Sequence, residues 1–191
     1  PALQAYVSGV GQKLAASSHR AKLKWTFTVL DSPEVNAFAL PGRRIGVYEG
    51  MLEVTATADQ LAAVIGHEIG HVVGRHSTQQ MAKTELVAGI AQGAGVAMSD
   101  GNSNGGMQIA RMVGNLVTMK YGREDETEAD RLGVKFMIDA GYDPEAMIGV
   151  MQILKASAGG GRQAEILSTH PDPGNRIEKI RAEIAKYRSA S

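Results

Sequence analysis

The chain has 191 residues, no cysteine, and 20 basic residues against 20 acidic ones, so its formal net charge is zero. Balanced charge argues against nucleic acid as a partner, because that contact requires a basic surface. The lack of cysteine excludes disulfides and thiolate ligands, so any metal ion must be held by nitrogen and oxygen. No apolar run reaches the roughly 20 residues that cross a bilayer. We therefore predict one soluble domain over residues 1–191, and expect a trimmed form that lacks its targeting segment, because Pro1 follows no hydrophobic leader.

The first part of the chain predicts one helix and three strands. Apolar residues recur at helical spacing from Leu3 to Leu14, which indicates an amphipathic helix. Residues 24–30 then alternate between apolar and polar side chains, as in a half-buried strand. Two further strands are predicted at Asn36–Leu40 and Arg44–Tyr48, with a turn at Pro41-Gly42 between them. We expect these two strands to form a hairpin within a small antiparallel sheet.

The next predicted helix carries the main functional motif. Thr57 and Gln60 have the spacing of a capping box, which indicates where the helix begins. Further along it, His67 and His71 lie about 40° apart on one helical face, so their imidazoles can bind one metal ion. Glu68 beside them can take a proton from a water on that ion. This is the His-Glu-x-x-His signature of metalloproteases, although so short a pattern also occurs by chance in unrelated proteins.

A row of small residues follows the same helix at i, i+4 spacing: Ala62, Gly66, Gly70 and Gly74. Since each glycine costs up to about 1 kcal/mol of helix propensity relative to alanine, we expect another backbone to pack very close to this row. His76 lies half a circumference away from His67 if the helix continues that far. It is therefore predicted to be a surface or helix-end histidine outside the metal face.

Two segments rich in Ala, Gly, Val and Met follow, at Glu85 to Met98 and at Met107 to Tyr121. With the polar, glycine-rich stretch between them, they predict a helical hairpin with a mobile tip. Ordinary packing against the domain is the favoured interpretation. The alternative is a lid, or a peripheral contact of residues 86–121 with a membrane or an outer-membrane assembly, because Met-rich surfaces adapt to varied apolar partners.

Glu126 and Asp130 stand at i, i+4 at the head of another amphipathic helix, which Gly141 is expected to end. Two further helices are predicted to begin at Asp143-Pro144 and at Asp172-Pro173, on either side of a glycine-rich break. The loop before the last helix contains His170.

Catalytic zinc usually takes three protein ligands, so one is still to be found. The candidates are His19, His170 and the carboxylates. Glu126 is the strongest of them, because an acidic group on the inner side of a buried helix is costly unless a metal or a cation compensates it. Asp130 could then accept a hydrogen bond from a ligand histidine. On spacing alone, a charged and solvated turn explains these two carboxylates equally well.

Five blocks of sequence resemble one protein family when they are taken together and in order. They are Asn36 to Gly42, Val47 to Leu52, Gly66 to His71, Glu126 to Arg131, and His170-Pro171 with Arg176. They resemble the HtpX, Oma and CAAX prenyl protease type of zinc metallopeptidases, and most of all its soluble periplasmic BepA-like branch. The resemblance implies an α+β fold: a mainly helical zincin domain of the gluzincin type with a small antiparallel sheet.

The resemblance also implies roles for single residues. One Zn²⁺ per chain would be held by His67, His71 and Glu126, and Asp130 would support the site. Glu68 would act as the general base.

His170 would stabilise the developing oxyanion or occupy the fourth zinc position at rest; the alternative is a loop histidine that only supports its turn. Arg176 would orient that loop or pair with a site carboxylate. An edge strand formed by Asn36, Ala37, Phe38 and Ala39 would bind an extended substrate through backbone hydrogen bonds. Arg43 departs from the family pattern, in which glycine is common, and affects only the turn.

We therefore expect a zinc metalloendopeptidase that hydrolyses unfolded or misassembled proteins, as part of quality control in the bacterial periplasm or cell envelope. The alternative is a chaperone-like binding module whose zinc site is structural or blocked.

Overall fold

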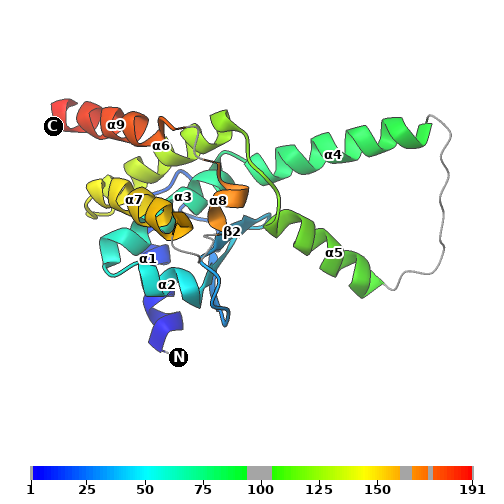
Figure 1. The fold of residues 1–191 in the computed structure, drawn as a ribbon, viewed down its shortest axis with the longest axis horizontal. Coiled ribbons are helices and arrows are strands. Elements are labelled where there is room, and N and C mark those ends of the chain that lie inside the picture. Colours follow the sequence, from blue (N-terminus) through cyan, green and yellow to red (C-terminus); the bar gives the residue numbers. More distant parts are fainter. Residues whose placement is uncertain (1, 94–104, 160–164, 172–173, 191) are drawn as a thin grey trace.

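A computed structural model describes residues 2–93, 105–159, 165–171 and 174–190 of the chain. Figure 1 shows a mainly helical body with a small sheet. The elements in chain order are α1 (Ala2–Ala16), β1 (Thr26–Leu30), β2 (Ala37–Leu40), β3 (Arg44–Tyr48), α2 (Glu49–Val54), α3 (Ala58–Val73), α4 (His76–Gly93), α5 (Gly105–Val117), α6 (Arg123–Asp139), α7 (Glu145–Gly159), α8 (Ile166–Thr169) and α9 (Arg176–Ala190). This pattern confirms the α+β class.

The sheet is mixed, so the prediction of an antiparallel sheet is wrong in part. Its strand order is β1-β3-β2. The hairpin between β2 and β3 is confirmed, but β1 runs parallel to β3, with Phe27 opposite Ile45. The reason is the connection after Leu30, which passes the end of β3 and starts β2 on its far side. The chain then returns as β3 between the two earlier strands, and this return makes β3 parallel to β1.

Helix α3 lies at the centre of the body and begins where its sequence predicts. The hydroxyl of Thr57 accepts a hydrogen bond from the backbone N–H of Gln60 at 3.2 Å. The two middle glycines of its row of small residues, Gly66 and Gly70, face α6, which is the close backbone contact that the row predicts. A methyl group at Gly70 would lie only 2.7 Å from the carbonyl oxygen of Ala129, and one at Gly66 would lie 3.4 Å from that of Gly133. Two helices that carry functional motifs are therefore in backbone contact.

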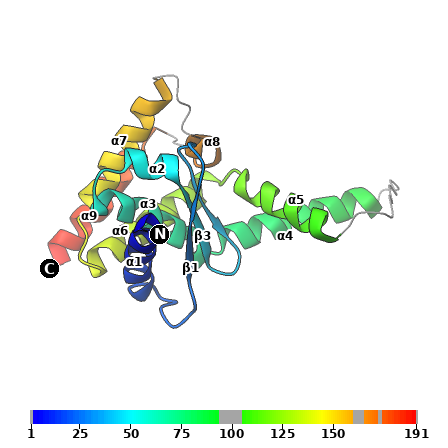
Figure 2. The same cartoon turned by 90° about the horizontal axis from the view of Figure 1, so that it is seen from below.

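Helices α4 and α5 extend away from the body, which differs from the favoured interpretation of packing along it (Figures 1 and 2). α4 begins at His76, well before the predicted start at Glu85. The predicted mobile tip falls mostly on residues 94–104, outside the described residues. Within the part of the chain that the structure describes, no helix is long and apolar enough to span a membrane.

The helix boundaries in the second half largely follow their local signals. Gly141 adopts a φ of 76° just after α6, which an L side chain rarely does. The carboxylate of Asp143 accepts a hydrogen bond from the backbone N–H of Glu145 at 3.0 Å, at the start of α7. The predicted start at Asp172-Pro173 lies outside the described residues, and α9 is observed from Arg176.

Candidate active site

Two helices and one loop bring four potential metal ligands together. The Nε2 atoms of His67 and His71 on α3 lie 3.0 Å apart. From α6, the Glu126 carboxylate places Oε2 at 3.4 Å from the first of these nitrogens and Oε1 at 3.1 Å from the second. His170, directly after α8, completes the group, whose ligand atoms all lie within 4.8 Å of one another.

The donor atoms of this group have the spacing that a small metal ion requires. A tetrahedral ion with bonds of about 2.0–2.1 Å to nitrogen or oxygen separates its ligands by about 3.3 Å. The site is also buried, and Nε2 of His170 has no hydrogen-bond partner among the described residues. A buried acceptor in that condition costs about 1–3 kcal/mol. These residues therefore fit a bound metal ion.

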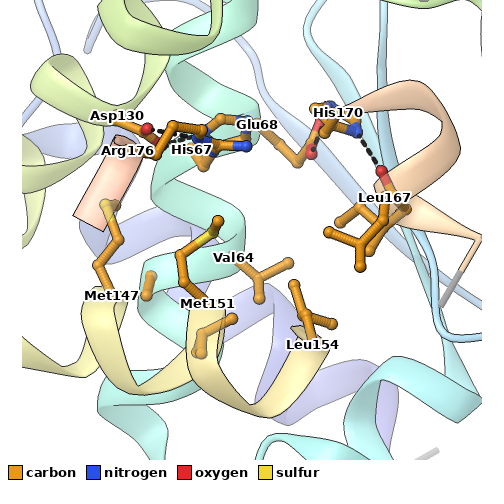
Figure 3. A pocket seen from close by; sticks show the side chains of 13 residues that line it. Val64, His67, Glu68, Asp130, Met147, Met151, Leu154, Leu167, His170 and Arg176 are labelled. Carbon is orange, nitrogen blue, oxygen red and sulfur yellow. Dashed lines mark hydrogen bonds and ion pairs between the residues drawn. The ribbon is translucent and has the colours of Figure 1, made fainter. Parts of the chain in front are cut away.

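On one side of the site, Asp130 and Arg176 support His67. The Nδ1 atom of His67 lies 2.8 Å from Oδ1 of Asp130. Arg176 donates to both oxygens of that carboxylate, at 2.8 and 2.7 Å, and its Nη1 lies 2.8 Å from Oε2 of Glu126. Figure 3 shows Asp130, Arg176 and His67 in line above the pocket. One buried guanidinium thus compensates two buried carboxylates.

On the other side, His71 contacts residues that sequence reasoning missed. His76 is only 2% exposed, and its Nδ1 lies 2.9 Å from Nδ1 of His71. The prediction of a surface or helix-end histidine is therefore right in part: His76 is the first residue of α4, but it is buried. It turns back to His71 because α3 ends at Val73 and Arg75 adopts a φ of 61° that redirects the chain into α4. The only sequence signal for this break was Gly74. The ring of Tyr121 stacks on His71 at a centroid distance of 3.8 Å, and no sequence signal pointed to it.

Glu68 points into a pocket with largely apolar walls. Its carboxylate is fully buried, and Oε1 lies 3.5 Å from Nε2 of His170. In Figure 3, Val64, Met151 and Leu154 face these two polar groups across the pocket. Burial raises the pKa of Glu68 to about 7, with a further contribution from the negative charge of Glu126. A carboxyl group in this state can both accept and release a proton near neutral pH.

His170 is held in one orientation and in its neutral form. Its Nδ1 lies 2.8 Å from the Thr169 hydroxyl and 3.2 Å from the carbonyl oxygen of Ile166. That carbonyl can only accept, and the Thr169 hydroxyl already donates to it at 3.1 Å, so this arrangement favours the tautomer with the proton on Nδ1. The other nitrogen, Nε2, therefore presents a lone pair towards Glu68 and the metal ligands. Burial lowers the pKa of His170 to about 4, which keeps the ring uncharged at neutral pH.

Without a metal ion, His67 is protonated at neutral pH. Burial opposes the charged ring, but Glu126 and the hydrogen bond to Asp130 outweigh this and raise the pKa of His67 to about 10. Burial likewise opposes ionisation of Glu126, yet the positive charges around it hold its pKa well below the usual range. A metal ion binds neutral imidazole, so it must displace this proton.

The predicted substrate strand lies beside the site, but it is covered. β2 is an edge of the described sheet, and it packs against α3 and α5. Ala37 and Ala39 are nevertheless only 0% and 1% exposed, and the side chain of Asn36 accepts from the backbone N–H of Ala37 at 2.9 Å. The N–H of Tyr121 donates to the carbonyl of Thr169 at 3.0 Å, which ties the segment after α5 to α8.

A helix that pairs two histidines with a buried glutamate, and receives a third ligand from a neighbouring helix, defines a class of protein. It is the arrangement of metal-dependent hydrolases that cleave peptide bonds with an activated water.

The chain belongs to peptidase family M48, whose sequence profile matches residues 1–184. It is 36% identical over 177 residues to the mitochondrial metalloendopeptidase OMA1 of Schizosaccharomyces pombe, covering 92% of this chain and 51% of that protein. It is 30% identical over 198 residues to the beta-barrel assembly-enhancing protease of Escherichia coli K12, covering 98% and 40%. The chain spans about half or less of the length of these two relatives.

Proposed function

We propose that this domain is a zinc-dependent metalloendopeptidase that cleaves extended segments of unfolded or misassembled proteins. The observation that carries the proposal is the buried donor set of His67, His71 and Glu126 with the Glu68 carboxylate beside it. Two imidazoles and a carboxylate form a donor set typical of catalytic zinc, which keeps one position open for chemistry. His170 is the fourth donor within reach of that position.

Zinc, when bound, would supply a Lewis acid that lowers the pKa of a water and polarises the peptide carbonyl. Glu68 would accept the proton of that water on a carboxylate oxygen and later pass it to the nitrogen of the leaving amine. Burial raises the pKa of this carboxyl group, which favours its uptake of the proton. Asp130 would hold the ring of His67 so that its Nε2 faces the ion.

We propose that His170 occupies the fourth position at rest and leaves it when substrate binds. Its neutral ring presents a lone pair at Nε2, which can bind a metal ion but cannot donate a hydrogen bond to an oxyanion. The rest of the site is consistent with a resting state, because Glu68 is fully buried. Substrate access then requires movement of the segment that the Tyr121 to Thr169 hydrogen bond ties to α8.

The substrate would bind as an added strand on β2. Tyr48 donates its N–H to the carbonyl of Asn36, so the alternation of an antiparallel pair turns the backbone groups of Ala37 and Ala39 away from β3. These groups could pair with an extended chain once the cover has moved, giving affinity with little sequence demand. Side chains beside the cleaved bond would enter the apolar pocket of Figure 3, whose methionines adapt to different shapes.

A role in envelope protein quality control is part of this proposal. It is supported by the name of the Escherichia coli relative, which links that protein to beta-barrel assembly, whereas other relatives are named as mitochondrial. A contact of residues 86–121 with a membrane or an assembly partner agrees with the projection of α4 and α5 from the body (Figure 2).

A second candidate is a chaperone-like module that binds unfolded chains without cutting them. The observation in its favour is the covered site, because no catalytic oxygen of Glu68 reaches solvent. Purified zinc-loaded protein would then bind unfolded chains and leave them intact during long incubation.

Exchange of Glu68 for glutamine tests the proposed function. The Glu68→Gln variant should keep one zinc per chain and lose casein cleavage by about 10²–10⁴-fold, the usual contribution of a general base. Metal analysis and a fluorescent casein assay measure both quantities. The exposed residue Glu178 on α9 provides a matched control, since Glu178→Gln should change neither. Cleavage at the parent rate by zinc-loaded Glu68→Gln would refute the mechanism.

A further inference from the structure

We infer that His76 and Glu128 form a relay that positions the metal ligand His71 and sets its proton arrangement. The structure gives the chain of contacts directly. Nδ1 of His71 lies 2.9 Å from Nδ1 of His76, and Nε2 of His76 lies 3.2 Å from Oε2 of Glu128. These three side chains come from α3, the start of α4 and α6. The inference rests on the proposed metal site and adds two positioning residues to it.

The chemistry of imidazole fixes the direction of each hydrogen bond. Nε2 of His71 faces the other ligands, so it must be free of a proton when the metal is bound, and the proton must sit on Nδ1. That N–H can donate only if Nδ1 of His76 accepts. His76 is then neutral with its own proton on Nε2, and it donates this proton to the Glu128 carboxylate. The relay therefore selects one tautomer at each ring.

The two ligand histidines are supported in different ways. His67 meets the Asp130 carboxylate directly at 2.8 Å, and Arg176 compensates that carboxylate. His71 meets a neutral ring instead, and the carboxylate lies one residue further out, where the Glu128 side chain is 48% exposed. A neutral acceptor adds no further negative charge to the buried carboxyl groups of Glu68, Glu126 and Asp130. We therefore assign the relay to orientation of His71 rather than to charge compensation.

The surroundings of His76 restrict its ring to this contact. It is 2% exposed, and its ring lies edge-on to that of His71 at a centroid distance of 5.0 Å. The ring of Tyr121 stacks on the ring face of His71, and the Tyr121 hydroxyl lies 2.8 Å from the Ser77 hydroxyl. His71 is thus held between the ring of His76, which accepts its hydrogen bond, and the ring of Tyr121, which stacks on its face.

The test is the zinc affinity of variants, measured by competition with a chromophoric chelator. Loss of a residue that supports a metal ligand typically weakens metal binding 10–100-fold. His76→Ala should weaken zinc binding by that factor. His76→Asn should retain most of the affinity, because an amide oxygen can replace Nδ1 as the acceptor. Glu128→Ala should weaken binding about two- to tenfold, whereas Glu124→Ala, an exposed glutamate one turn earlier on α6, should not.

Nitrogen-15 spectra of histidine-labelled, zinc-loaded protein give a second readout, in which His76 should appear as the neutral Nε2–H tautomer. The melting temperatures of the metal-free variants show whether they remain folded. A folded His76→Ala variant with parental zinc affinity, or a His76→Asn variant as weak as His76→Ala, overturns the relay. If His76→Ala does not fold, equal affinities of Glu128→Ala and Glu124→Ala overturn it. Failure of the parent itself to bind zinc refutes the proposed function instead.

Discussion

Replacement of Arg176 by alanine should destabilise the metal-free protein severely. Its guanidinium contacts two carboxylates, Asp130 at 2.7 and 2.8 Å and Glu126 at 2.8 Å, and all three groups are buried. Removal of one partner from a buried ion pair costs about 3–5 kcal/mol, because the remaining charge is left uncompensated. In a domain of this size each kcal/mol lowers the melting temperature by about 2–4 °C, so we expect a fall of about 6–20 °C.

Thermal unfolding followed by circular dichroism, with and without zinc, measures the effect. Zinc would compensate Glu126, so the zinc-loaded variant should lose less stability than the metal-free one. Arg181→Ala removes an exposed arginine from the same helix and should change the melting temperature by no more than a few degrees. A loss below about 1 kcal/mol in metal-free Arg176→Ala would refute the reasoning from buried charge.

The effect of Arg176→Ala should also depend on pH in a definite direction. Burial alone would raise the pKa of Asp130, but the hydrogen bonds from His67 and Arg176 lower it below its usual range. A lowered pKa contributes stability above the unfolded value, near pH 4, and this stability is lost as pH falls through the folded value. Without Arg176, protonation of the Asp130 carboxyl group removes the cost of its buried, uncompensated charge. The difference in the free energy of unfolding between the parent and Arg176→Ala should therefore become smaller as pH falls from 7 towards 4.

Three further predictions follow from the site and its helices. His170→Ala should raise basal casein cleavage, since it frees the fourth position; a loss of cleavage would instead support a role for His170 with the oxyanion. Gly70→Ala should lower the free energy of unfolding, measured by chemical denaturation, by about 1–3 kcal/mol, because the new methyl group would lie 2.7 Å from the Ala129 carbonyl oxygen. Gly66→Ala is the control: its methyl group would lie 3.4 Å from the Gly133 carbonyl oxygen, so the change should be neutral or stabilising. Zinc affinity should rise about tenfold per pH unit from pH 6 to 8, because the proton on His67, whose pKa is about 10, must leave when the ion binds. Calorimetry in buffers of different ionisation enthalpy should detect one proton released per ion bound. Zinc binding without proton release would contradict this prediction.

Local signals were sufficient for the helix that carries the histidines. The Thr57 cap begins α3, and the row of small residues correctly predicted a second backbone in close contact. The approach of α6 follows from that row, because Gly66 and Gly70 leave no side chain between the helices. The placement of Glu126 within reach of both histidines is a direct result. Here a periodic pattern contained the tertiary information.

Other features depend on long-range geometry that no local pattern encodes. Alternating side chains predicted three strands but not the parallel pairing of β1 and β3, which depends on where the connection after Leu30 crosses. His76 was misplaced because a helix was extended through Arg75, and a non-glycine residue at positive φ has no reliable sequence signature. The stacking of Tyr121 on His71 likewise joins residues far apart in the chain.

The enclosure of the site would govern the kinetics of metal exchange. The four candidate ligand residues are buried, Tyr121 stacks on His71, and its N–H is bonded to the carbonyl of Thr169, so exchange of a bound ion would require this segment to open. The release rate is then set by how often the segment opens, and a stronger chelator removes the ion no faster. An ion acquired as the chain folds would stay with the protein long after free zinc has become scarce, so zinc supply during synthesis would determine how much active protein is made.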